Sequence, residues 1–427
     1  MHINSIEIRN FRRFEHFKCE FHPRLTLLMG SNGSGKTSLL KAIFMGFGSG
    51  LQQAGVHMPM GLEDVRRVNA VDPSNESWRT AVFPFQIVLH LTEGSNSIEL
   101  WHVRTPPGET RFMPDGSHAS HHGYREFGHK IQRWFAPTCS QSIPLFARFG
   151  ASHSWSGDGR AGQIRKPFEN KQEIWQRFSS DSIDIGGLAQ WFQYNELRSL
   201  QEGVQPLVYR LAKQAVLAAI HAEDINYVVR DNQLMVKHAE HGWRPFEQLS
   251  DGQRRLAAVF MELAMRAASL NSQLGEDCIR ETTGVVLIDE LDLHLHPQWQ
   301  RSVIDNLLSV FPKLQFVVAS HSPFLLQSAF EHGIVVDVAT GQPVSPGDPS
   351  IEDIAENVMG VEQPQRSRRF LDMKELAQKY LELLETPTHT PEQKAVLKQQ
   401  LDEALAVFAN DPAAAAWLEQ RRSAKGL

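Results

Sequence analysis

The sequence predicts an α/β fold in which helices flank a central, largely parallel sheet. Two short apolar runs, 25–29 and 284–288, have the composition of strands that a parallel sheet buries on both faces. A glycine-rich loop follows the first run, and two adjacent acids follow the second. The 427 residues are 41% hydrophobic and 22% charged, which is typical of a globular chain with a sizeable core.

The expected elements follow from the spacing of the apolar residues. Alternating or continuous apolar runs indicate strands, and apolar residues three or four positions apart indicate helices. The expected strands are 3–8, 25–29, 83–91, 98–103, 143–149, a hairpin over 225–238, 284–288 and 315–319. The expected helices are 38–44, 173–201, 204–221, 254–270 and 297–310. Mainly loops are expected over 46–82, with one short helix, and over 105–130 and 150–172.

The pattern predicts a head, 1–345, followed by a helical C-terminal region, 346–427. Within the head, 51–244 is expected to be a variable insertion of loops and helices. Thr390 followed by a proline marks the expected start of a tail helix, because proline is favoured at the first helical position. This helix packs on the core or, as the alternative, docks a partner protein.

Composition argues against several classes of protein. The net charge of −6 argues against a generally basic nucleic-acid-binding surface and leaves only a local patch for nucleic acid. Three cysteines lie far apart, which predicts neither a disulfide framework nor a zinc knuckle. No apolar run approaches the roughly 20 residues that span a bilayer. The sequence therefore predicts a cytoplasmic protein with no membrane partner.

The glycine-rich loop is GSNGSGKT, residues 30–37. Its pattern, G-x-x-x-x-G-K-T between a strand and a helix, is that of a phosphate-binding loop. Backbone N–H groups of such a loop surround phosphate oxygens at the positive end of the following helix. Lys36 is expected to reach the β- and γ-phosphates of a nucleotide, and Thr37 to hold Mg²⁺ through its hydroxyl.

The second apolar run ends in LIDELDLHLHP, residues 287–297. Asp289 is expected to support the bound Mg²⁺, and Glu290 to polarise an attacking water. The alternative is a metal site built from His294, His296 and the nearby acids, but this pattern supplies too few ligands for zinc. We therefore expect the two histidines to cap or pack a loop that precedes the next helix.

A third motif, LSDGQRR at 249–255, opens a predicted helix. Together with the glycine-rich loop, the two acids, LDLHLHP and ASHSP, it resembles the motif set of ABC-type ATPase heads. The resemblance implies a sandwich in which two heads share each ATP. Ser250 and Gly252 would act on ATP held at Lys36 of the partner copy, and His321 would contact the γ-phosphate in cis.

The resemblance also implies the cofactors ATP and Mg²⁺. The candidate catalytic residues are Glu290 and His321, and the candidate metal ligands are Thr37 and Asp289. The candidate cofactor-binding residues are Gly30, Ser31, Asn32, Gly33, Ser34, Gly35, Lys36, Thr37, Ser38, Ser250, Gly252, Gln253 and Asp292.

Within this family, the opening IRNFRRFEHF resembles the DNA-repair and chromosome-maintenance branch (RecF, Rad50 and SMC relatives) and the overcoming-lysogenization-defect ATPases. The later motifs are most similar to stand-alone prokaryotic defence ATPases, such as the ATPase subunits of Septu systems and of some retrons. No heptads and no C-x-x-C pair lie between the loop and LSDGQRR, so coiled-coil arms and a zinc hook are not expected. No acidic cluster suited to a Toprim nuclease follows His321.

The Q-loop glutamine of the family has no evident counterpart in the sequence. Phe149 or Gly150 stands in its place if 143–149 is the equivalent strand. Gln86 and Gln193 are the alternatives.

Two functions of different class follow from these motifs. In the first, the ATPase forms a homodimer or higher oligomer in anti-phage defence and controls a separate effector, such as a nuclease, in some systems with a retron reverse transcriptase. In the second, it is a RecF-like DNA clamp in repair. The arginines near the motifs and in the tail are interpreted as solvated surface, with DNA contact as the alternative. They are Arg9, Arg12, Arg13, Arg254, Arg255, Arg366, Arg368 and Arg369.

Overall fold

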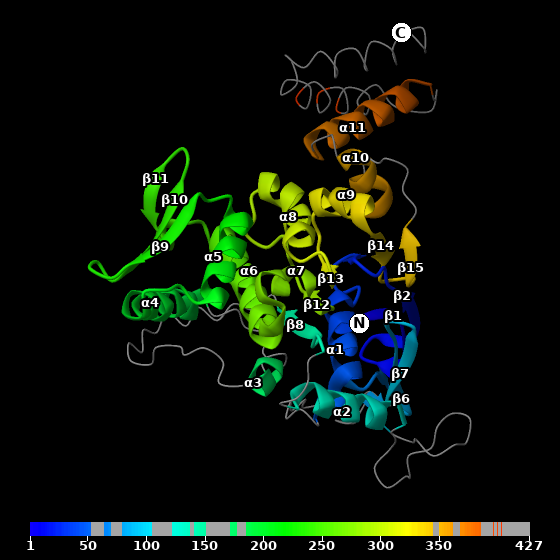
Figure 1. Cartoon of the computed structure of the whole chain (residues 1–427). Coiled ribbons are helices and arrows are strands. Elements are labelled where there is room, and N and C mark those ends of the chain that lie inside the picture. The colour runs from blue at the N-terminus through cyan, green and yellow to red at the C-terminus, as the bar shows by residue number, and fades with distance from the viewer. Residues whose placement is uncertain are drawn as a thin grey trace. The chain divides into compact units, whose positions relative to one another are not determined.

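The computed structural model of the chain (Figure 1) divides into two compact units, Met1–Pro349 and Ser350–Leu427. The structure describes residues 1–52, 64–69, 79–104, 122–136, 141–150, 171–176, 185–344, 350–361 and 368–385, together with Val396, Gln399 and Glu403.

The core of the first unit is a sheet with the strand order β15-β14-β3-β13-β12-β8. Neighbouring strands run parallel, except for the antiparallel hairpin of β14 and β15. Every residue of β3, β12 and β13 is buried, as expected for parallel strands covered on both faces. The strands are β3 (Leu25–Met29), β8 (Leu145–Phe149), β12 (Gly284–Ile288), β13 (Leu314–Ala319), β14 (Ile334–Asp337) and β15 (Gln342–Val344).

The parallel register brings the ends of four strands to one edge of this sheet. Ile288 is paired with Phe149 on one side and with Val318 on the other, and Ala319 is paired with Leu28. The segments that follow β3, β8, β12 and β13 therefore emerge beside one another. In open α/β sheets, ligands bind at such carboxyl ends.

A second, antiparallel sheet has the order β2-β1-β6-β7. Gln315 of the central sheet connects the two sheets, because its amide accepts from Ile3 N at 2.7 Å and donates to Ile3 O at 2.8 Å and His22 O at 3.0 Å. The strands are β1 (His2–Phe11), β2 (Phe14–Glu20), β6 (Phe85–Glu93) and β7 (Asn96–Arg104).

Helix α1 (Lys36–Gln52) contacts β6 and β7 of this sheet as well as β13 of the central sheet. A Cβ at Gly46 would lie 2.3 Å from Cδ1 of Leu89 in β6, so this glycine lets the helix approach the strand. The helix is longer than the predicted 38–44.

The remaining elements of the first unit surround these sheets. A small sheet with the order β11-β10-β9 lies beside α4 and α5, and α5 packs along α6 (Figure 1). The strands are β4 (Arg67–Asn69), β5 (Arg79–Ala81), β9 (Asp224–Val228), β10 (Gln233–His238) and β11 (Gly242–Pro245). The helices are α2 (His122–Phe135), α3 (Lys171–Gln176), α4 (Ile185–Glu202), α5 (Leu207–Ile220), η3 (Phe246–Gln248), α6 (Asp251–Leu270), η4 (Ser272–Asp277), α7 (Cys278–Glu281), α8 (Pro297–Val310) and α9 (Pro323–His332).

The second unit contains α10 (Ile351–Asp353), the π-helical turn η5 (Ile354–Val358) and α11 (Arg368–Glu385). The tail helix predicted from Thr390 lies outside the described residues, apart from the three helical positions Val396, Gln399 and Glu403.

Several predicted elements differ from the structure. The loop prediction for 105–130 is wrong at its end, where α2 buries Phe127, Ile131 and Trp134 at helical spacing. The prediction of a hairpin over 225–238 missed the third strand, β11. The strands β4 and β5 stand where loops were predicted. The helix predicted over 173–201 corresponds to α3 and α4, and the residues between them lie outside the described ranges.

Candidate functional site

The glycine-rich loop lies between β3 and α1, at the edge where the parallel strands end. Its three glycines, Gly30, Gly33 and Gly35, have φ angles of 147°, 77° and 103°, a region that favours glycine. The side chain of Lys36 is buried, and its Nζ donates to the carbonyls of Gly30 at 2.8 Å and Ser31 at 3.3 Å. The ammonium group is therefore held against the loop.

The rim of this loop is open to solvent. Ser31, Asn32 and Gly33 are exposed, and Thr37 at the start of α1 is exposed as well. Ser38 is half-buried on the next position of the helix. The rim of the loop and the first turn of α1 are thus accessible from solution.

The acids that follow β12 lie within electrostatic reach of Lys36. Burial lowers the pKa of the Lys36 ammonium, whereas the negative charges of Asp289, Asp292 and Glu290 act in the opposite direction. Asp289 is buried, and its backbone N–H donates to Phe149 O at 2.8 Å. The structure therefore brings together the lysine and the carboxylates that the sequence analysis grouped.

Arg255 of α6 contacts the backbone that carries these acids. Its guanidinium donates to Glu290 O at 2.5 Å and to Asp289 O at 2.9 Å, with Gly150 O at 3.5 Å. Arg255 is 3% exposed, so its interpretation as solvated surface is wrong. Burial lowers the pKa of this guanidinium, and the charges of the nearby acids oppose that shift. Glu290 has a φ of 51°, and the bond to its carbonyl stabilises this uncommon backbone.

The LSDGQ motif forms the N-terminus of α6. Ser250 is the N-cap, with a reciprocal capping box in which its Oγ accepts from Gln253 N at 3.3 Å and Gln253 Oε1 accepts from Ser250 N at 3.1 Å. Ser250 is exposed, whereas Gly252 is buried. A Cβ at Gly252 would lie 2.4 Å from the carbonyl oxygen of His294, so only glycine allows this approach. The segment that follows Glu290 thus rests on the start of α6.

His321 follows β13 and lies between Ser320 and Ser322. Ser322 is the N-cap of α9, and its backbone N–H donates to Ser320 Oγ at 2.9 Å. His321 itself is partly exposed. The parallel register places it at the same edge as the acids and the loop.

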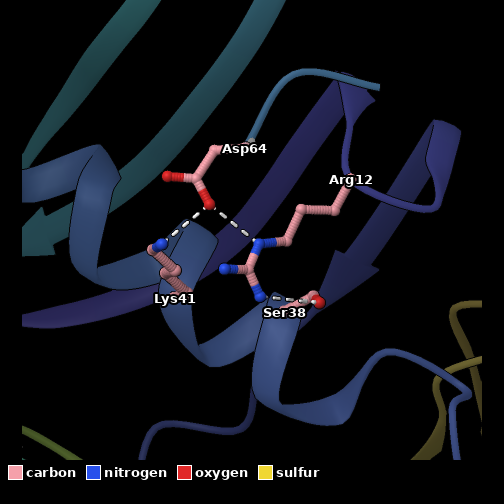
Figure 2. Close-up of polar contacts among 4 residues, drawn as sticks. All are labelled: Arg12, Ser38, Lys41 and Asp64. Carbon is pink, nitrogen blue, oxygen red and sulfur yellow. Dashed lines mark hydrogen bonds and ion pairs between the residues drawn. The ribbon is translucent and has the colours of Figure 1, made fainter. Parts of the chain in front are cut away.

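A buried carboxylate supports α1 beside the loop (Figure 2). Asp64 is fully buried, and its Oδ1 accepts from Arg12 Nε at 2.9 Å and from Lys41 Nζ at 2.7 Å. Arg12 also contacts Ser38 Oγ at 3.4 Å. Arg12 is therefore engaged in an ion pair and is not simply solvated, and a second arginine, Arg13, donates to the carbonyl of Gly33.

The Q-loop candidates fall at different places. The strand β8 lies next to β12, and Gly150 stands at its carboxyl end. Gln86 lies in β6 opposite Arg9, in the antiparallel sheet. Gln193 donates to Asn232 at 3.2 Å on an exposed surface. Within the described residues, neither alternative glutamine is on the strand-end edge.

The two histidines near the acids have local roles. His296 is the N-cap of α8, and its Nδ1 accepts from Gln298 N at 3.3 Å. His294 has a φ of 62° and contacts α6 through its carbonyl. In the described ranges, no group of three or more His, Cys, Asp or Glu residues could hold a metal ion.

The site fits a nucleotide with a divalent cation. Ser34 Oγ and Asp292 Oδ1 are buried and have no hydrogen-bond partner within the part of the chain that the structure describes. Thr37 and Asp289 supply the oxygen donors that Mg²⁺ prefers. Sequence reasoning missed the roles of Arg255, Gln300 and Asp64, which bond to residues 34, 22 and 52 positions away in the chain.

Comparisons with known proteins agree with this fold. A family model described as AAA domain, putative AbiEii toxin, Type IV TA system matches residues 158–327, and an AAA ATPase domain model matches residues 1–80. The chain is 24% identical over 392 residues to the retron Ec83 probable ATPase of Escherichia coli, which covers 76% of this chain and 69% of the relative. The α/β fold and its glycine-rich loop agree with the ATPase domains and the probable ATPase that these descriptions name.

Three further proteins show similarity to this chain. The Septu protein PtuA of Bacillus thuringiensis is 24% identical over 388 residues, 87% of each chain. The DNA replication and repair protein RecF of Lactococcus lactis is 46% identical over 43 residues, 10% of this chain and 12% of the relative. The SMC head domain from Thermotoga maritima has a TM-score of 0.47 at 14% identity and covers 81% of this chain and 100% of that one. None of the helices described here is long and apolar enough to cross a membrane.

Proposed function

We propose that this chain binds Mg-ATP between two head copies, hydrolyses it, and thereby controls a separate effector protein in anti-phage defence. The observation that carries the proposal is the grouping of Lys36 with Asp289, Glu290 and Asp292 at the edge where the parallel strands end. The resemblance to retron and Septu ATPases over most of the chain supports the defence role.

In this proposal, Lys36 exchanges its contacts with the carbonyls of Gly30 and Ser31 for the β- and γ-phosphates of ATP. Thr37 and Asp289 hold Mg²⁺, which when bound neutralises charge on the phosphates. The backbone N–H groups of the loop and the N-terminus of α1 bind the remaining phosphate oxygens.

Hydrolysis requires a base and a contact with the γ-phosphate. Glu290 accepts a proton from the water that attacks the γ-phosphorus, and the bond between that phosphorus and the bridging oxygen of ADP breaks. His321 donates a hydrogen bond to a γ-phosphate oxygen. The products are ADP and phosphate.

The second head supplies its α6 N-terminus. Ser250 is exposed at that N-terminus, and the positive end of a helix favours an anion. Ser250, Gly252 and Gln253 of one copy bind the γ-phosphate of ATP held at Lys36 of the other. Each sandwich thus contains two composite sites, and the assembled state reports that ATP is bound.

The effector part of the proposal has a direct test. Tagged Glu290→Gln protein is expressed in its native host and recovered with ATP present, and co-purifying proteins are identified by mass spectrometry. A stoichiometric nuclease or reverse transcriptase supports the defence role. Recovery of the chain alone, or with DNA and repair factors, contradicts it.

Two matched variants control this recovery. Lys36→Ala removes the phosphate contact and is expected to lose any partner that depends on the ATP-bound state. Glu240→Gln makes the same chemical change at an exposed turn between β10 and β11 and is expected to behave as the wild type.

A RecF-like DNA clamp is the second candidate function. The similarity to RecF over 43 residues favours it. Stimulation of ATP hydrolysis by duplex DNA, in the purified chain without other proteins, would support this candidate over effector control.

A further inference from the structure

The side chain of Gln300 connects the acidic segment, residues 289–295, to the histidine loop, residues 320–322. It projects from the first turn of α8 and is half-buried. Its Nε2 donates to Leu295 O at 2.9 Å, with Asp292 O at 3.5 Å. Its Oε1 accepts from Ser322 Oγ at 2.6 Å. The nitrogen of this amide therefore bonds to the acidic segment, and its oxygen bonds to the histidine loop.

The orientation of this amide is determined by its partners. Ser322 Oγ accepts from the backbone N–H groups of Phe324 and Leu325, at 3.2 and 3.3 Å. The single hydroxyl proton of Ser322 is thus available for Gln300, whose oxygen must face it. The two carbonyls of the acidic segment require a donor, which only the NH₂ group supplies.

The segment that Gln300 holds has an uncommon backbone. Glu290 and His294, which border the turn, both lie in the left-handed region, with φ angles of 51° and 62°. Such residues persist where their surroundings hold them in place. Leu295 N donates to Asp292 O at 3.0 Å. The Gln300 amide therefore contacts the carbonyl of Leu295, which follows His294, and the carbonyl of Asp292, which already accepts the bond from Leu295.

The histidine loop is held from the other side. Ser322 is adjacent to His321, and its backbone N–H is bound to Ser320 Oγ at 2.9 Å. The acidic turn meets the same strand end at Leu291, whose N–H donates to Ala319 O at 3.4 Å. The Gln300 amide therefore closes a ring of contacts that joins the segment after Glu290 to the residues on both sides of His321.

We propose that Gln300 is a positioning residue that fixes the acidic turn bearing Glu290 relative to the loop bearing His321. The inference rests on the proposed hydrolysis of ATP at this site. Without the amide, nucleotide binding at the glycine-rich loop persists, because in the described part of the chain Gln300 bonds to Leu295, Asp292 and Ser322, and Lys36 bonds to the loop itself. The water-activating carboxylate and the γ-phosphate contact lose their fixed separation, so hydrolysis slows.

The test compares Gln300→Leu and Gln300→Glu with wild type in steady-state ATP hydrolysis and in equilibrium binding of ATP. Gln300→Leu removes both sets of bonds, whereas Gln300→Glu keeps an acceptor for Ser322 and places a carboxylate against Leu295 O. Both variants are expected to lower kcat by about tenfold or more, since a displacement near 1 Å can cost up to 100-fold. Their ATP dissociation constants are expected to stay within about twofold of wild type.

Gln298→Leu is the matched control, because Gln298 is on the same turn of α8 and is exposed. It is expected to keep the wild-type kcat. A Gln300→Leu protein that keeps wild-type kcat overturns the inference, as does a loss of ATP binding equal to the loss of hydrolysis. If the leucine variant does not fold, the glutamate variant decides by the same criteria. Absence of hydrolysis in the wild type would instead contradict the proposed function.

Discussion

Replacing Arg255 by methionine tests whether the start of α6 holds the backbone of the two acids. The substitution keeps an unbranched apolar side chain of similar reach and removes the donors to Glu290 O at 2.5 Å and Asp289 O at 2.9 Å. Hydrogen bonds to a charged group contribute about 1.5–3 kcal/mol each, so the two give about 3–6 kcal/mol. The cost of burying the guanidinium, seen in its lowered pKa, offsets part of this. We expect a net loss of about 3 kcal/mol.

The loss is measured as a shift of the urea unfolding midpoint at constant slope. Arg230→Met, at an exposed turn, is the control and should stay within about 0.5 kcal/mol of wild type. Where the variant is folded, its ATP hydrolysis should also fall, because the Glu290 backbone loses its carbonyl contact. A variant within about 1 kcal/mol of wild type that hydrolyses ATP normally would refute the reasoning.

Three further predictions follow from the site. Glu290→Gln should trap an ATP-bound assembly, seen as a doubled mass in size-exclusion chromatography with ATP. Lys36→Ala should stay at the lower mass. Normal turnover of ATP by the glutamine variant would contradict the role of Glu290. Gly252→Ala brings a Cβ to 2.4 Å from the carbonyl of His294, so it should destabilise by about 1–3 kcal/mol and slow hydrolysis, with unchanged thermal unfolding as the contradicting result. Asp64→Asn should lower the free energy of unfolding by about 2 kcal/mol. This is less than for a fully buried ion pair, because the side chains of the two cationic partners are 31% and 23% exposed. A loss of stability that vanishes at low salt would argue against the role of these ion pairs.

The inner strands β3, β12 and β13 of the central sheet were predictable because they are nearly continuous apolar runs, whereas β14 and β15 were not predicted. The predicted strands 25–29 and 284–288 coincide with β3 and β12, and the predicted helix 297–310 coincides with α8. Strong local signals fix these bounds: apolar residues between glycines and acids, and proline at the first helical position.

Other elements depend on packing that a local pattern does not contain. Helix α1 extends through Gly46, a residue that lowers helix propensity, because the missing Cβ allows contact with Leu89. Helix α2 was missed because glycines and histidines surround its apolar positions. In both cases tertiary contacts outweigh the local preference.

The candidate site divides in the same way. The glycine-rich loop and the two acids carry signals within a few residues, and the structure places them at one edge. Arg255 and Gln300 have no such signal, because their partners are carbonyls and a hydroxyl brought close by the fold. Nothing in the pair Arg254-Arg255 tells which of the two is buried.

The Gln315 amide also bears on how the chain is made on the ribosome. Its partner Ile3 is 312 residues earlier, and the strands that pair with β3 in the described structure, β13 and β14, emerge late as well. At 5–20 residues per second, the apolar β3 waits about 15 to 60 seconds for its neighbours. The glycine-rich loop is therefore synthesised before the strands of the sheet that supports it. Chains that stop before β13 expose an unpaired apolar strand, which is a starting point for aggregation.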